Sequence, residues 1–118
     1  MRDIIAVAIG GFIGTTLRFT ASKWIPAVHF PWGTLTVNLI GSFFLALITY
    51  ARGMPLHPRI RLGLATGLIG SFTTFSTFCA EWLILPSPVA FGYGSLSLIG
   101  GLGCAWLGAQ IGKGRNAC

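Results

Sequence analysis

The chain has 118 residues, of which 53% are hydrophobic and only 8% are charged, whereas a soluble domain carries roughly 25% charged residues. Its formal net charge of +6 does not indicate nucleic-acid binding, because the basic residues are scattered singly instead of forming a stripe. The charges leave four uncharged stretches, each long enough or nearly so to cross a bilayer. We therefore expect an all-α, multi-pass protein of the cell (inner or plasma) membrane, in contact with the lipid bilayer and with no nucleic-acid partner.

Four transmembrane helices are expected, joined by short connections that contain prolines. The first apolar stretch has no convincing cleavage site, so we interpret it as a retained helix and not as a signal peptide. Short connections make neighbouring helices antiparallel and place both termini on one side of the membrane. The helices form a single domain over residues 1–118, at about 4–24, 32–52, 60–84 and 89–111.

Positive charge is concentrated on the side that holds the termini. The opposite side has Lys23, with Arg18 in the last turns of the first helix. The positive-inside rule therefore favours cytoplasmic termini. The basic residues expected on the terminal side are Arg2, Arg52, Arg59, Arg61, Lys113 and Arg115.

Small residues recur four apart on three of the helices and favour close helix packing. Four short helices cannot surround a polar pathway and also shield it from lipid, so we expect the protein to oligomerise. The small residues are Ala6, Gly10 and Gly14 on the first helix, Gly63 and Gly67 on the third, and Gly108 and Gly112 on the fourth.

The middle of the third span, Gly70-Ser71-Phe72-Thr73-Thr74-Phe75-Ser76-Thr77-Phe78, is rich in hydroxyl groups and phenylalanine. Glycine and threonine weaken a helix, so the sequence predicts a break in this span. Non-helical backbone at membrane depth is tolerated only where it is buried in protein or lines a polar cavity. Its carbonyls suit a cation, and its N–H groups suit an anion. The alternative is that these hydroxyls bond back to the preceding helical turn.

Neutral donors make up most of the polar groups inside the spans. Phe75 and Phe78 share a helix face and either pack or present their positive ring edges to an anion. The amide of Asn38 either joins two helices or donates to an anion. Tyr93 and Ser97 are four residues apart and offer further hydroxyl donors.

Arg18 and Glu81 are the charges that lie well inside the spans. Arg18 either snorkels to the interface or attracts anions into a vestibule, and Glu81 either caps that vestibule or pairs with a basic residue. The sequence shows no nucleophile–base pair, histidine cluster or metal-ligand spacing, so we do not expect an enzyme. These donors suit the passage of a small anion, which must exchange its hydration shell for weakly bound partners.

Three motifs closely resemble the CrcB/Fluc fluoride channel family: Gly10-Gly11-Phe12-Ile13-Gly14 with Arg18, the segment Gly33 to Phe43 around Asn38, and the run Gly70 to Phe78. The resemblance covers essentially the whole chain. It implies a fluoride-selective channel that exports cytoplasmic fluoride passively and relieves its toxicity. It also implies an antiparallel, dual-topology dimer with two pores.

The resemblance also assigns residues to roles. A structural sodium ion (Na+) at the dimer interface would be held by the backbone carbonyls of Gly70 and Thr73. Arg18 would lie in the vestibule, where we also place Glu81 from its position in the third span. Ser71-Phe72 departs from the family, many members of which have a second glycine there. The fluoride pore would be lined by Asn38, Phe75, Phe78, Tyr93 and Ser97, with Thr74, Ser76 and Thr77.

The charge asymmetry leaves the dimer partner open. The chain forms a homodimer, or it inserts mainly one way and forms a heterodimer with an oppositely oriented homologue. Two other classes compete with a channel. A small multidrug-type exporter needs a titratable carboxylate in the membrane core, which the first helix lacks. A non-transporting assembly subunit would not explain the run of hydroxyl groups and phenylalanines.

Overall fold

The computed structural model describes residues 1–25 and 30–116, with side chains up to residue 114. Over these residues it is all-helical and has four helical segments long and apolar enough to span a membrane. Part of the expected first connection, residues 26–29, lies outside the described residues. The segments are α1 (Arg2–Trp24), α2 (Trp32–Tyr50), a third span over Pro58–Ile84, and α6 (Ser87–Asn116).

The predicted break in the third span is confirmed. The span consists of α3 (Pro58–Leu62), a π-helix η1 (Gly63–Ile69), α4 (Gly70–Phe72) and α5 (Ser76–Ile84). Thr73, with an extended backbone (φ −78°, ψ 159°), begins a three-residue interruption that ends at Phe75. The π-helix was not predicted from the sequence.

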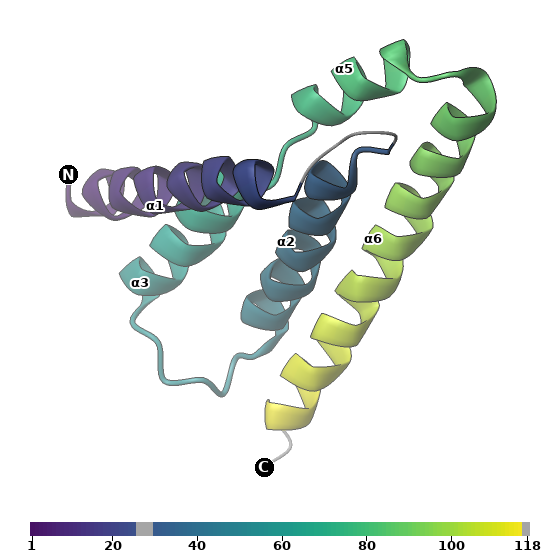
Figure 1. Ribbon diagram of the computed structural model, residues 1–118. Helices are drawn as coiled ribbons and strands as arrows, with labels where there is room; N and C mark the ends of the chain where they lie inside the picture. Colours follow the sequence, from purple (N-terminus) through teal and green to yellow (C-terminus); the bar gives the residue numbers. More distant parts are fainter. Residues whose placement is uncertain (26–29, 117–118) are drawn as a thin grey trace.

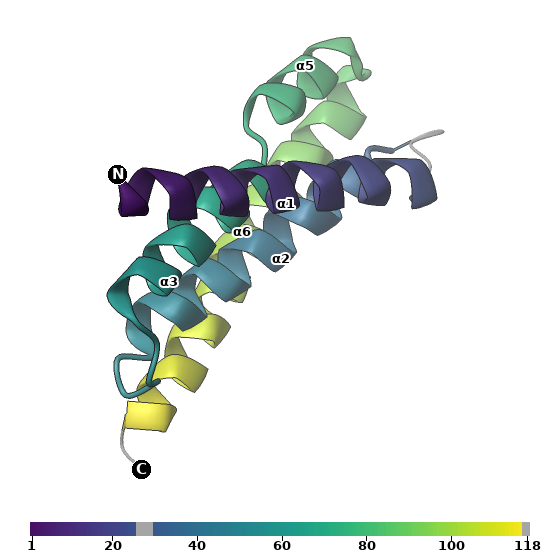
Figure 2. The same ribbon diagram turned by 90° about the vertical axis from the view of Figure 1, so that its left-hand side faces the viewer.

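Helices α2 and α6 run side by side, whereas α1 crosses α2 steeply and packs on η1 (Figures 1 and 2). The α2–α6 contact depends on small residues, because a Cβ on Gly108 would overlap the carbonyl oxygen of Phe43. The same contact explains why α6 extends beyond the expected end near residue 111. Gly112 lies against Ala51, and the ammonium group of Lys113 lies 5.1 Å from the ring centroid of Tyr50.

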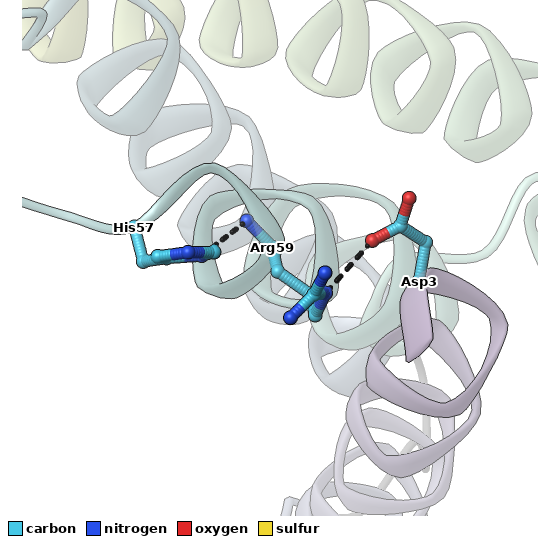
Figure 3. A network of polar contacts seen from close by, with 3 residues as sticks. All are labelled: Asp3, His57 and Arg59. Carbon is cyan, nitrogen blue, oxygen red and sulfur yellow. Dashed lines mark hydrogen bonds and ion pairs between the residues drawn. The ribbon is translucent and has the colours of Figure 1, made fainter. Parts of the chain in front are cut away.

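Polar contacts bring the basic segments together at one end of the fold. Arg59 Nε donates to Asp3 Oδ1 at 3.0 Å, and the Arg59 N–H donates to His57 Nδ1 at 3.2 Å (Figure 3). The Arg61 guanidinium donates to the carbonyls of Ile48 and Ala51, at the end of α2. The start of α1, the start of the third span and the end of α2 are therefore neighbours, as the short connections predict.

Candidate functional site

Asn38 of α2 holds the break in the third span through both ends of its amide. Its Nδ2 donates to the carbonyl of Thr74 at 3.0 Å, and its Oδ1 accepts the Thr74 N–H at 2.8 Å. The side chain thereby replaces the backbone partners that Thr74 would have in a continuous helix. Of the two roles open for Asn38, the structure gives it the helix–helix contact, and the second N–H of its amide is left for another acceptor.

The hydroxyl groups that follow the break form a cluster at the start of α5. Thr74 Oγ1 donates to Thr77 Oγ1 at 3.1 Å, accepts the Thr77 N–H at 3.2 Å, and lies 3.4 Å from Ser76 Oγ. Thr73 is different, because its Oγ1 bonds back to the carbonyl of Ile69 at 3.1 Å. Back-bonding therefore accounts for Thr73 and not for the three hydroxyls beyond it.

An aromatic row leads from the break toward the start of α2. The rings of Phe75 and Phe78 are 6.0 Å apart, those of Phe78 and Tyr93 are 5.0 Å apart, and those of Tyr93 and Phe30 are 5.4 Å apart. Phe75 is 77% exposed, whereas Tyr93 is fully buried. Sequence analysis missed Phe30, because a residue in a proline-flanked connection belongs to no helical pattern.

Glu81 of α5 is held by two hydroxyl groups from other helices. Thr34 Oγ1 donates to Glu81 Oε1 at 2.9 Å, and the Tyr93 hydroxyl donates to Oε2 at 2.9 Å. The carboxylate thus links α2, α5 and α6. From the sequence, Glu81 is expected either to cap a vestibule or to pair with a basic residue, and the contact with Thr34 is not predicted. Thr34 lies four residues before Asn38 in the same motif.

Two hollows meet at the break. One of about 340 Å³ contains Arg18 and Glu81, which were predicted to share a vestibule. The other, of about 270 Å³, contains Gly70 and Thr73, whose carbonyls were predicted to bind sodium. Thr74 lines both hollows, so the break is where they approach each other. The remaining polar or aromatic residues in their walls are Thr15, Phe19, Ser22, Thr34 and Thr77 in the first, and Asn38, Ser42 and Phe75 in the second.

Ser97 has a buried hydroxyl with no hydrogen-bond partner among the described residues. Buried hydroxyls are normally satisfied, so an unpaired one requires an explanation. Ser97 lies four residues after Tyr93 on α6 and therefore on the same helix face. Ser97 lines neither of the two hollows, so its place in a pathway stays a prediction.

The chemistry of this region is that of binding and not of catalysis. Its polar groups are an amide and hydroxyl groups, beside the near-parallel rings of Phe75 and Phe78, and its two charged groups lie at the wall of one hollow. The residues that the structure describes include no group of three His, Cys, Asp or Glu side chains that could hold a metal ion. The four apolar spans define a small integral membrane protein. The break in the third span, with its polar groups, is a candidate pathway for a small solute.

Comparison with known proteins identifies the family. The family described as CrcB-like protein, Camphor Resistance (CrcB) matches residues 5–109, and the chain belongs to this family. The fluoride-specific ion channel FluC of Oceanobacillus iheyensis is 42% identical, with 94% of this chain and 92% of that protein aligned. FluC 2 of Halalkalibacterium halodurans is 40% identical (92% and 84% aligned), and FluC of Thermotoga maritima is 39% identical (96% and 96% aligned).

Proposed function

We propose that this chain is a fluoride-selective ion channel that lets fluoride leave the cytoplasm passively and thereby relieves its toxicity. Curated relatives named as fluoride-specific ion channels align with it over nearly their whole length. The observation that carries the proposal is the broken third span, where Asn38 holds Thr74 between two hollows. Family membership and this geometry support the same function.

Fluoride is small and strongly hydrated, so it enters a low-dielectric region only if protein donors replace its water. The hydroxyls of Ser76 and Thr77 and the second N–H of Asn38 supply such donors at the break, whereas the Thr74 hydroxyl donates to Thr77 and holds it in place. The edges of aromatic rings attract an anion weakly, which allows release. Fluoride therefore passes Phe75, Phe78 and Tyr93, with Ser97 as a further donor on α6. Arg18 raises the local anion concentration at the vestibule.

The pathway is completed by a second, antiparallel subunit. The Phe75 ring is 77% exposed although it lies next to the break, so one chain does not enclose it. Gly70 and Thr73 line the same hollow, and their carbonyls would hold a sodium ion together with the equivalent groups of the second subunit. The Gly70 and Thr73 carbonyls of one chain are two oxygens, and two chains together would supply four to coordinate the ion.

An exporter that exchanges protons for a cationic drug is the rival function. The structure argues against it, because both oxygens of Glu81 accept hydrogen bonds from hydroxyls and α1 has its only carboxylate, Asp3, in its first turn. A non-transporting assembly subunit is the other rival. That role does not explain why a buried Ser97 hydroxyl is unpaired or why Asn38 stabilises a break in the third span.

The test uses bacteria that lack their own fluoride channel and drug exporters. We expect cells expressing this chain to grow at fluoride concentrations that stop control cells, with no gain in resistance to ethidium. The Phe78→Ile variant, expressed to the same level, should not protect against fluoride. Resistance to ethidium without resistance to fluoride would favour the exporter and contradict the channel.

A further inference from the structure

The third span changes its winding just before the break. Over Gly63–Ile69 it is a π-helix, in which an N–H bonds to the carbonyl five residues earlier, as the Gly70 N–H does to the Ala65 carbonyl. A π-turn accommodates one more residue than the α-turn it replaces, and such turns are rare and often found at functional sites. The proposed fluoride path uses no side chain of η1 as a donor, so the π-helix needs a separate explanation.

Helix α1 contacts this π-helix backbone to backbone. A Cβ on Gly10 would overlap the carbonyl oxygen of Gly63 and lie 2.8 Å from the amide nitrogen of Leu68. A Cβ on Gly14 would overlap the carbonyl oxygen of Leu68. Because these neighbours are backbone atoms, a side chain at position 14 fits only if α1 moves away from η1 or the carbonyl of Leu68 moves, and the second change alters the winding of η1.

The far end of the π-helix leads into the break. The N–H and Oγ1 of Thr73 both donate to the carbonyl of Ile69, at 3.0 and 3.1 Å. The Thr73 methyl group occupies the space that a Cβ on Gly41 would fill, and the next residue, Thr74, is bound by Asn38. The direction in which Thr73 and Thr74 point toward α2 therefore depends on the backbone conformation at the end of η1, at Ile69.

We propose that η1 sets the register of the break, and that Gly10 and Gly14 are positioning residues that maintain its π-winding. The extra residue in η1 turns Thr73 and Thr74 toward Gly41 and Asn38. If η1 relaxed to an α-helix with the same number of residues, everything after it would rotate by about 100°, the turn of one residue. Asn38 would then lose Thr74. This inference rests on the proposed fluoride channel.

The first experiment removes the extra residue. Thr66 is an exposed residue within η1, and its deletion lets η1 wind as an α-helix while Thr73 and Thr74 keep their direction. The matched control deletes Ile99, a 71% exposed residue in the α-helix α6, where no extra residue is present to lose. We expect the Thr66 deletion to keep at least about a third of wild-type fluoride efflux from liposomes and the Ile99 deletion to abolish it.

The second experiment alters the winding without changing the chain length. Gly14→Ala should reduce fluoride efflux by about tenfold and lower the preference for fluoride over chloride, because the donors are misplaced. Combining Gly14→Ala with the Thr66 deletion should restore most of both. If Gly14→Ala only weakened the packing of α1, deleting an exposed residue of η1 would not restore the flux. Gly103→Ala, where a Cβ meets nothing within 4 Å, is the matched substitution control.

Three results would overturn the inference: a Thr66 deletion as inactive as the Ile99 deletion, a Gly14→Ala protein with wild-type flux and selectivity, or a double variant no better than Gly14→Ala. Size-exclusion chromatography first establishes that each variant forms a dimer, and flux is compared only among variants that do. The wild-type protein in the same liposomes tests the proposed function by itself, so failure of the channel proposal is distinguishable from failure of the register proposal.

Discussion

Asn38 combines two functions at the level of a single residue, because it holds the break and faces one of the hollows. Replacing it by alanine leaves the Thr74 N–H and carbonyl without their partner, at a cost of about 1–3 kcal/mol for each unsatisfied buried group. We expect Asn38→Ala to lower the melting temperature and to reduce fluoride efflux by about tenfold or more.

The control for Asn38 lies one turn further along α2. Ser42 Oγ donates only to the backbone carbonyl of Asn38, at 2.8 Å, so Ser42→Ala leaves the break intact. We expect it to keep at least about half of the wild-type flux, since a single hydrogen bond of this kind contributes only about 0.5–1.5 kcal/mol to stability. If Asn38→Ala conducted fluoride as well as Ser42→Ala, the role given to Asn38 would be wrong.

Substitution of the two phenylalanines near the break separates the electrostatic effect of a ring edge from the effect of side-chain volume. Isoleucine retains apolar volume but has no positive ring edge. Phe75→Ile and Phe78→Ile should each reduce fluoride efflux by about tenfold or more, while the dimer still forms in detergent. The matched control is Phe91→Ile, since Phe91 is 67% exposed on α6 and contacts Trp82 instead of the break. Equal flux in all three variants would contradict the assignment.

Residue types at the site could be predicted because intramembrane polar groups are costly and therefore few. The sequence pointed to Asn38, Glu81 and Tyr93 for this reason. It did not reveal that Thr34 and Tyr93 share the carboxylate of Glu81, because this contact joins residues 47 and 12 positions away along the chain. Such pairing depends on how α2, α5 and α6 are placed, which spacing within one helix does not determine.

At the scale of elements, composition predicted the break and not the π-helix. Glycine and threonine near position 70 weaken an α-helix, and this local effect is visible in the sequence. A π-turn differs by one residue per turn and leaves the apolar pattern of Gly63–Ile69 almost unchanged. Its cause lies in a different helix, where Gly10 and Gly14 meet its backbone.

The contact between α2 and α6 gives a stability prediction at the same scale. The Cβ of a valine at Gly108 would overlap the carbonyl of Phe43, whereas a Cβ at Gly103 meets nothing within 4 Å. Overpacking of this kind typically costs about 1–3 kcal/mol. We therefore expect Gly108→Val to lower the melting temperature in detergent by several degrees or to prevent assembly, and Gly103→Val to leave it unchanged. Equal melting temperatures would show that this contact does not limit stability.

For the whole molecule, the distribution of charge determines orientation. Most basic residues are at one end, and the structure offsets two of them locally: Arg59 pairs with Asp3, and Arg61 donates to the carbonyls at the end of α2. The remaining excess still favours one orientation. We infer that the chain inserts mainly one way when expressed alone. The minority inserted the other way then limits how many antiparallel homodimers form, and an oppositely oriented homologue, where the cell has one, is the more abundant partner.

Cysteine labelling in intact cells tests that orientation. The reporter is Met54→Cys, in the connection at the basic end, in a chain whose Cys79, Cys104 and Cys118 are replaced by alanine. A membrane-impermeant reagent should label most chains only after the cells are opened. Substantial labelling in intact cells would show insertion in both directions, and the partner would then be a second copy of this chain.

The most direct test of the central claim is fluoride efflux from liposomes that contain the purified protein, followed with a fluoride electrode and with chloride as the competing anion. In detergent, chains meet without a preferred orientation, so antiparallel dimers can form from this chain alone. We predict rapid release of fluoride, little release of chloride, and loss of fluoride release in Phe78→Ile. No release of fluoride by the wild-type protein, or release of chloride at the same rate, would contradict the central claim.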